Sequence, residues 1–284
     1  MVILVTGAHG QLGQALQSIA LNYTEIQFQF CGSQEVNLTD KASIQNAFSA
    51  YHPNFCINAA AYTAVDKAES EPEKAYTINT DGVQNLAEIC LEHQTILLHV
   101  STDFVFDGLN KTPYVETDVP HPTGVYGASK WAGEQAVQEI LTRYYIVRTA
   151  WVYSNFGANF MKTMLRLGAE RDQLKVVDDQ IGSPTLATDL ATTLVIMCLQ
   201  TAQDFTSAPY GVYHYSNEGY CSWFEFAQQI LLNHGLKTPV LPIPTSEFPT
   251  PAKRPAYSVL DKSKIKKAFA LEIPRWQEAL KSGI

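Results

Sequence analysis

The chain is poor in the residues that build disulfides and zinc sites. Its five cysteines are scattered over 284 residues without a Cys-x-x-Cys pair, at Cys31, Cys56, Cys90, Cys198 and Cys221. An odd, scattered set predicts buried thiols in a reducing compartment. The seven histidines show no metal-ligand spacing. We therefore expect no metal site built from these residues and a cytoplasmic location.

Long apolar runs and an excess of basic residues are also missing. The most apolar helical stretch, Leu190 to Leu199, is too short to span a bilayer, and no signal-peptide pattern stands at the N-terminus. The formal net charge of -8 argues against nucleic acid or an anionic membrane as partner. With 46% hydrophobic residues, the chain can bury one large core or a core plus a smaller lobe.

Strand and helix patterns alternate over the first half of the chain. Apolar strand-like runs cover Val2 to Val5, Ile26 to Phe30, Phe55 to Ile57, Ile96 to Val100 and Tyr145 to Val147. Helical patterns separate them, including a long helix that Pro72 opens and another that starts near Tyr126. This rhythm predicts an α/β fold, a Rossmann-like doubly wound parallel sheet with helices on both faces.

Beyond Trp151 the rhythm weakens. Helical patterns cover residues 159–169, 187–199 and 223–232, and a proline-rich segment runs from Pro239 to Pro255. We expect a Rossmann domain over residues 1–155, with a segment near 185–217, around Tyr213, returning to it. Residues 156–284 would form mainly a smaller lobe packed closely against that domain.

A glycine-rich turn follows the first strand. Gly7, Gly10 and Gly13 are spaced as GxxGxxG, and Leu12 and Leu16 continue at helical spacing. Such glycines let the backbone approach a pyrophosphate, whose charge meets the N–H groups of a helix N-terminus. A tight turn without a ligand would give the same pattern. The position directly after a strand favours nucleotide binding.

Tyr126 and Lys130 share one helix face because they lie four residues apart. A neighbouring cation favours the phenolate of a tyrosine, so such a tyrosine can exchange a proton with a carbonyl oxygen as hydride moves. The segment Ser101 to Gly108 ends the strand before this helix, where ligands of open α/β sheets bind. Thr102 could bond the same carbonyl oxygen, and Asp103 a sugar hydroxyl. An ST-type turn closing the strand is the alternative.

These motifs together resemble a known family. The chain carries the GxxGxxG turn, NAAAYTAVD at 58–66, STDFVFDG at 101–108 and YGASK at 126–130. In this order they resemble the extended short-chain dehydrogenase/reductases and, within them, the dTDP-4-dehydrorhamnose reductases. The segments 148–153, 179–185 and 253–258 extend the likeness to nearly the whole chain. The resemblance implies reduction of the C4 ketone of dTDP-4-dehydro-L-rhamnose to dTDP-L-rhamnose with NADPH or NADH.

The resemblance also implies roles for single residues. Tyr126 would be the proton donor, with Thr102 beside it, and Lys130 would bind the nicotinamide ribose. Thr102 and Asp103 would meet the sugar, with Val65 and Trp151 as walls of its site. The cofactor would contact the glycine turn with Gly7, Gly10, Gln11, Leu12 and Gly13, and also Asn37, Leu38, Ala60, Ala61, Tyr62, Thr63, Tyr126 and Lys130.

The sequence departs from the family pattern at two places. Asn37-Leu38 stands where an aspartate often lies beside the adenine, although asparagine can accept the same hydrogen bond. Members that bind Mg²⁺ at a dimer contact use carboxylates, one of them early in the first helix. Here Gln14 to Gln17 carries no acid. We therefore expect no Mg²⁺ and a monomer or weak homodimer.

Several alternatives stay open at this point. Related dehydratases use a Thr-Asp-Glu run, and Phe104 replaces that glutamate here, which disfavours water elimination. An epimerase uses the same Tyr and Lys, and the substrate could be another nucleotide-linked keto-deoxysugar. A noncatalytic subunit resembling the regulatory β subunit of methionine adenosyltransferase is the alternative from another class. The intact Thr102, Tyr126 and Lys130 favour an enzyme.

Two ligand expectations follow from charged residues. No acid precedes Glu35 at the end of the second strand, so we expect NADPH and NADH both to work, with NADPH modestly preferred through Ser33. Arg254, in Lys253-Arg254-Pro255, is the candidate for the substrate diphosphate because a guanidinium binds phosphate oxygens bidentately. A solvated turn or an ion pair is the alternative for Arg254.

Overall fold

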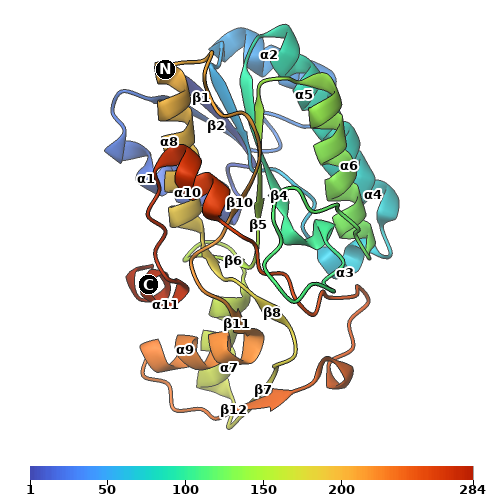
Figure 1. Cartoon of the computed structure of the whole chain (residues 1–284), viewed down its shortest axis with the longest axis vertical. Helices are drawn as coiled ribbons and strands as arrows, with labels where there is room; N and C mark the ends of the chain where they lie inside the picture. The colour runs from blue at the N-terminus through green and yellow to red at the C-terminus, as the bar shows by residue number, and fades with distance from the viewer. Residues whose placement is uncertain (284) are drawn as a thin grey trace.

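A computed structural model describes residues 1–283 and has a six-stranded parallel sheet at its centre (Figure 1). The strand order is β10-β5-β4-β3-β1-β2, and every neighbouring pair is parallel. The predicted Rossmann-like α/β fold is confirmed. The strands are β1 (Val2–Thr6), β2 (Gln27–Cys31), β3 (Phe55–Asn58), β4 (Ile96–Thr102), β5 (Tyr144–Thr149) and β10 (Gly211–Tyr215).

Helices cover both faces of this sheet because successive strand residues point to opposite sides. Val5 and Leu98 face one core with Leu16 and Leu194, whereas Leu4 and Leu97 face the other. The first face carries α1 (Gln11–Ile19), α8 (Ala187–Gln203) and α10 (Ser263–Phe269). The second carries α2 (Lys41–Tyr51), α5 (Gly82–Glu92) and α6 (Val125–Ile140).

The long helix expected from Pro72 onward is interrupted. It consists of α4 (Pro72–Tyr76), a π-helical turn η2 (Thr77–Asp81) and then α5. Within the π turn, the Asn79 amide bonds both backbone groups of Tyr62 and the Ser129 hydroxyl. Through these bonds, Asn79 of the π turn supports the loop after β3 and the first part of α6. π turns recur at functional sites, and no periodicity of apolar residues reveals them.

A smaller lobe lies beyond the carboxyl edge of the sheet, at the lower end of Figure 1. Its core includes Met164, Phe226, Ile230 and Trp276. The helices are α7 (Phe160–Glu170), α9 (Trp223–Asn233) and α11 (Trp276–Ser282). Three short strand pairs complete it: β6 (Val152–Tyr153) with β9 (Thr185–Leu186), β7 (Leu174–Val177) with β12 (Val240–Ile243), and β8 (Ile181–Gly182) with β11 (Cys221–Ser222).

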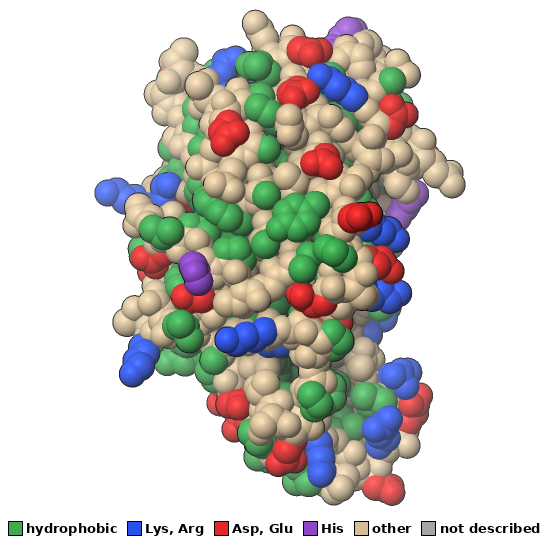
Figure 2. All heavy atoms as spheres, turned by 90° about the vertical axis from the view of Figure 1, so that its right-hand side faces the viewer, with side chains coloured by type: hydrophobic (Ala, Val, Ile, Leu, Met, Phe, Trp, Pro, Cys, Tyr) green, Lys and Arg blue, Asp and Glu red, His purple; other side chains and the backbone are tan. Residues whose placement is uncertain are grey.

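The chain returns from this lobe to the sheet, where β10 pairs with β5 through Tyr213 and Val147. The remaining short elements are η1 (Ala20–Asn22), α3 (Val65–Ala68), η3 (Asp103–Val105) and η4 (Thr245–Glu247). Within residues 1–283, no helix has the length and apolar character to cross a membrane. Figure 2 shows acidic and basic side chains interspersed over the face that carries the second helix layer.

Candidate active site

The glycine turn is shaped so that no side chain fits at two of its positions. Gly7 has φ +69°, and a Cβ there would lie 2.6 Å from the Ala60 backbone nitrogen. A Cβ at Gly13 would lie 2.3 Å from the Gly7 carbonyl oxygen. Gly10 is the N-cap of α1 and supplies no side-chain cap. The first N–H groups of α1, at Gln11, Leu12 and Gly13, therefore form an uncapped helix end suited to an anion.

Gln11 links this turn to the smaller lobe. Its side-chain oxygen accepts hydrogen bonds of 2.9 Å from the Ser154 hydroxyl and the Asn159 amide. Asn159 also caps α7, because its own oxygen accepts from the Lys162 N–H. The side chain of Gln11 is thus bound within the protein, and its backbone N–H remains the group that faces the turn.

The end of β2 differs from the sequence expectation. The Glu35 carboxylate folds back and accepts a 2.8 Å hydrogen bond from the Gly32 N–H. A Cβ at Gly32 would also meet the His9 ring at 2.4 Å, so this ring covers the strand end. An acid therefore does reach the end of β2, which corrects the premise of the expected NADPH preference. Ser33 is exposed beside it.

The loops after β2 and β3 carry the other expected cofactor residues. Asn37 is exposed and bonds Thr39 through its side-chain oxygen, while Leu38 is buried and its carbonyl oxygen accepts from Asn85. After β3, the chain from Ala60 through Ala61 to Thr63 runs along the same edge, and the Tyr62 hydroxyl donates to Glu71. Like the glycine turn, these segments follow the carboxyl ends of strands, where parallel sheets bind ligands.

Thr102 ends β4 and fixes the following turn. Its hydroxyl donates to Asp103 at 3.1 Å and accepts from the Phe104 N–H at 3.2 Å. Asp103 is 2% exposed, and its second carboxylate oxygen has no hydrogen-bond partner within residues 1–283. Burial raises the pKa of Asp103 to about 6, against the lowering effect of the Ser258 and Thr102 hydroxyls. This carboxyl group therefore has an unused acceptor.

Tyr126 lies in the first turn of α6, with its ring at the edge of the Phe104 ring, 5.5 Å between centroids. Burial raises the pKa of Tyr126 to about 12; the neighbouring Thr102 hydroxyl lowers this pKa and Asp103 raises it. The structure thus brings Thr102, Asp103 and Tyr126 together. The expected lowering of the Tyr126 pKa by a neighbouring cation is absent because Lys130 bonds elsewhere.

Lys130 points into the sheet. Its Nζ donates to the Val100 carbonyl oxygen at 2.8 Å and lies 3.3 Å from Nε2 of His99. Burial lowers the pKa of Lys130 to about 8, and the Glu134 charge opposes that lowering. One turn further along α6, Glu134 is fully buried and holds Arg148 through a 2.7 Å ion pair. Glu134 also accepts a short hydrogen bond from Ser101.

A cleft of about 590 Å³ opens between the Rossmann sheet and the smaller lobe. From the sheet side it is lined by Val65, Asp66 and Phe104, and from the lobe by Trp151 and Trp223. The two tryptophan rings stack at 3.5 Å with 9° between their planes. Trp151 adopts φ +47°, which a non-glycine residue seldom does and which recurs at functional sites. Sequence reasoning missed Trp223, because nothing in its spacing sets it apart.

Arg254 also lines this cleft. Its guanidinium bonds the Asp66 carboxylate at 2.8 Å and lies over the Phe104 ring at 5.7 Å. Asp66 accepts a second bond, from the Ala252 N–H. The ion pair named as an alternative for Arg254 is therefore present, and it joins α3 to the segment after η4.

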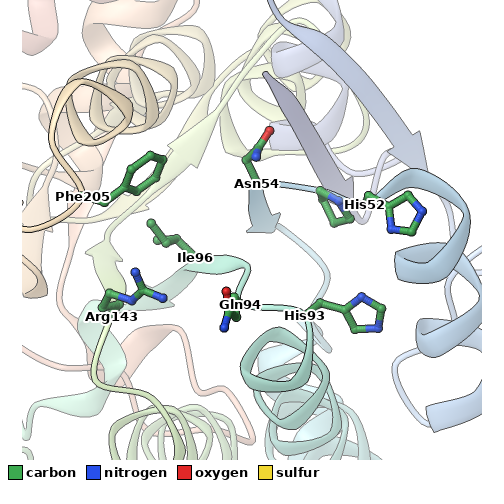
Figure 3. A pocket seen from close by; sticks show the side chains of 8 residues that line it. His52, Asn54, His93, Gln94, Ile96, Arg143 and Phe205 are labelled. Carbon is green, nitrogen blue, oxygen red and sulfur yellow. The ribbon is translucent and has the colours of Figure 1, made fainter.

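A second cavity, of about 320 Å³, lies at the opposite edge of the sheet (Figure 3). Its lining includes Asn54, Gln94, Arg143 and Phe205. One nitrogen of the His93 ring, Nε2, lies 2.9 Å from the Gln45 amide nitrogen. Among residues 1–283, no group of three His, Cys, Asp or Glu side chains converges in a metal-binding arrangement.

This fold and site define a class of protein. A glycine turn after the first strand of a parallel sheet, with a Tyr-Lys pair on the helix beside β4, is the arrangement expected from the sequence resemblance to the extended short-chain dehydrogenase/reductases. Over residues 1–284 the sequence matches the family described as RmlD substrate binding domain, and the chain belongs to this family.

Named relatives agree with this assignment. The chain is 42% identical to the dTDP-4-dehydrorhamnose reductase of Aggregatibacter actinomycetemcomitans, over 99% of this chain and 97% of that protein. The dTDP-4-dehydrorhamnose reductase from Bacillus anthracis, solved in complex with NADP, is 41% identical with a TM-score of 0.92, covering 99% and 98% of the two chains. A UDP-glucose 4-epimerase from Thermus thermophilus, 19% identical with a TM-score of 0.83 over 100% and 97% of the chains, shares the fold alone. The resemblance inferred from the motifs is confirmed.

Proposed function

We propose that this chain reduces the C4 ketone of dTDP-4-dehydro-L-rhamnose to dTDP-L-rhamnose with NADPH or NADH. The observation that carries the proposal is the Tyr126 phenol beside the Thr102 hydroxyl at the carboxyl end of β4. The relatives' names supply the substrate. No comparable observation favours a noncatalytic subunit, because all the groups that the reduction needs are present.

The dinucleotide lies along the carboxyl edge of the sheet in this proposal. Its pyrophosphate meets the N–H groups of Gln11, Leu12 and Gly13. The backbone of this turn is accessible because no side chain fits at Gly7 or Gly13. Asn37 and Leu38 lie beside the adenine. The loop of Ala60, Ala61, Tyr62 and Thr63 lines the nicotinamide half. Lys130 binds the nicotinamide ribose after its Nζ turns away from His99. The neighbour solved in complex with NADP supports the binding of a dinucleotide of this kind.

The chemistry needs one hydride and one proton. The bound reduced nicotinamide supplies the hydride to C4 of the sugar. Tyr126 gives its phenolic proton to the C4 oxygen. The Thr102 hydroxyl turns its one proton from Asp103 to that same oxygen and donates a hydrogen bond to it. Tyr126 then recovers a proton from solvent. A pKa near 12 keeps Tyr126 protonated before the reaction, as a proton donor must be.

The sugar nucleotide occupies the cleft in this proposal. Asp103 accepts a sugar hydroxyl through the carboxylate oxygen that lacks a partner. Val65 and Trp151 pack against the sugar, and Arg254 meets the diphosphate. Domain roles follow: residues 1–155, with the returning segment near 185–217, bind the cofactor, and residues 156–284 bind mainly the substrate.

We propose a monomer or weak homodimer without Mg²⁺, because Gln14 and Gln17 of α1 bond the His9 and Ala8 carbonyl oxygens of their own chain. We propose the cytoplasm as its location, since all five cysteines lie buried as free thiols. Light scattering with and without Mg²⁺ tests the first of these statements.

The test is incubation with dTDP-4-dehydro-L-rhamnose and NADPH while the absorbance of the reduced nicotinamide is followed. Tyr126→Phe keeps the ring but removes the transferable proton, so turnover should fall by roughly 10² to 10⁴ while the cofactor still binds. Tyr144→Phe is the matched control, because Tyr144 starts β5 at the opposite edge of the sheet. Lys130→Met should impair both turnover and cofactor affinity. A folded wild-type protein that consumes no NADPH would refute the proposal.

A further inference from the structure

His99 is a buried titratable group that the proposed chemistry does not use. It lies in the middle of β4 with no exposed surface. One ring nitrogen, Nδ1, is 3.0 Å from the Asn58 amide nitrogen, and the other, Nε2, is 3.3 Å from the Lys130 nitrogen. The ring therefore joins the end of β3 to Lys130.

The orientation of the Asn58 amide is fixed by its other contacts. Its oxygen accepts from the Ala60 backbone N–H at 3.1 Å and from the Thr6 hydroxyl at 2.6 Å. A backbone N–H can only donate, so the atom facing Ala60 must be the oxygen. The amide NH₂ then faces His99, and it too can only donate. Nδ1 of His99 must accept this bond and carries no proton.

The position of the ring proton follows. A neutral imidazole with a bare Nδ1 carries its proton on Nε2. That N–H points at Lys130, whose nitrogen accepts it only as an uncharged amine. An amine can still donate to the Val100 carbonyl oxygen at 2.8 Å, so all the hydrogen bonds around His99 are satisfied in this state. With an ammonium at Lys130, two donors would face each other.

We propose that His99, oriented by Asn58, is a positioning residue that opposes protonation of Lys130 in the cofactor-free protein. The proposal rests on the proposed function for the role of the cofactor, but its protonation claim concerns the free protein. Burial acts in the same direction, since it lowers the pKa of Lys130 and of His99. The Lys130 ammonium forms only when this contact is given up.

The charged groups around Lys130 do not override the effect of His99 on its protonation. Glu134, on the same helix, favours an ammonium, but its carboxylate is held by Arg148 of β5. Tyr126, one turn earlier, stays protonated because burial raises its pKa. The pKa of Asp103, beyond the end of β4, is also raised by burial. Lys130 is directed toward His99 and Val100, so its charge does not lower the pKa of Tyr126.

The tautomer of His99 can be observed directly. Long-range nitrogen-proton NMR spectra of the ¹⁵N-labelled full chain distinguish the two neutral tautomers, and His99→Gln assigns the signal by its loss. We expect the Nε2–H form between pH 6 and pH 9. The Nδ1–H form, or an imidazolium, would overturn the proposal. This experiment needs neither substrate nor cofactor.

A second experiment reverses the direction of the hydrogen bond between residue 58 and Nδ1 of His99. In Asn58→Asp, a carboxylate can accept from Nδ1–H, so Nε2 becomes an acceptor and favours the Lys130 ammonium. The affinity for NADPH, an anion, should fall as pH rises through the pKa of Lys130. In Asn58→Asp this fall should move to higher pH by about one unit, a tenfold change in proton affinity. In His99→Gln, whose amide oxygen can turn toward Lys130, it should move in the same direction.

His214→Gln is the matched control, because His214 is equally buried but its ring faces Arg148 and the Tyr114 carbonyl oxygen. Its pH profile should match the wild type. If Asn58→Asp does not fold, the His99→Gln profile decides. Binding of NADPH with an unmoved profile in the folded variants would overturn the proposal. Absence of NADPH binding at every pH would instead refute the proposed function, and the NMR result would still stand.

Discussion

Glu35 is the residue in best position to set cofactor preference, because its carboxylate lies at the end of β2. There an acid repels the 2′-phosphate of NADPH but can accept from the ribose hydroxyl of NADH. Glu35→Gln should raise the ratio of kcat/KM for NADPH to that for NADH by roughly tenfold, or 1.4 kcal/mol. Steady-state kinetics with both cofactors measures the ratio.

The matched control for this substitution is Glu25→Gln. Glu25 is an exposed acid just before β2, at the opposite end of that strand. It should leave the ratio unchanged. An unchanged ratio in Glu35→Gln would mean that this carboxylate does not reach the ribose.

For single residues, the sequence predicts which residues belong to the site better than it predicts the contacts that they make. The spacing of Tyr126 and Lys130 places them one helical turn apart, because helix geometry is regular. It does not reveal that Lys130 bonds His99 and Val100, since those partners come from another strand. Glu35 was misjudged for a similar reason: its side chain reaches back over three residues to Gly32.

The turn between β1 and α1 is the element on which cofactor binding depends. Gly7→Ala forces a Cβ against Ala60 at positive φ, and should lower the free energy of unfolding by about 2 to 4 kcal/mol. Gly10→Ala, with φ -75° and a nearest contact of 3.3 Å, should cost less than about 1 kcal/mol. Denaturant unfolding of both variants measures the difference.

The two variants separate folding from binding. Gly10→Ala should weaken NADPH binding while the fold stays near wild-type stability, because its Cβ would stand where the pyrophosphate approaches. Equal losses of stability in the two variants would contradict the strained geometry assigned to Gly7.

Among the elements, the sheet and its covering helices could be predicted from apolar periodicity. The strands at residues 55–58, 96–102 and 144–149 extend the expected runs by one to three residues. The π turn at Thr77–Asp81 could not be predicted, because apolar periodicity does not show the contacts of Asn79 with Tyr62 and Ser129. The strand pairs of the lobe were missed as well. Most of these strands contain only two residues, too few for an alternating pattern.

At the scale of the whole molecule, the cleft joins distant parts of the chain, because its lining residues Arg254 and Asp66 lie 188 positions apart. Arg254→Ala should raise the KM for the nucleotide sugar by a factor equivalent to roughly 1.5–3 kcal/mol, with cofactor affinity near normal. Asp66→Asn is the control, since it breaks the ion pair but keeps the guanidinium. Steady-state kinetics on both variants gives the comparison.

If Arg254 binds the diphosphate, Asp66→Asn should leave KM unchanged or lower it. A rise in KM as large as that of Arg254→Ala would assign Arg254 to the ion pair alone. Weaker binding of both cofactor and sugar nucleotide in Arg254→Ala would indicate damage to the fold.

The most direct measurement for the whole account is the fate of a labelled hydride. NADPH carrying deuterium at the transferred position of its nicotinamide is incubated with the protein and dTDP-4-dehydro-L-rhamnose, and the product is examined by NMR and mass spectrometry. We predict one deuterium at C4 of the sugar and dTDP-L-rhamnose as product. Deuterium retained in the cofactor, or a product labelled at another carbon, would contradict it.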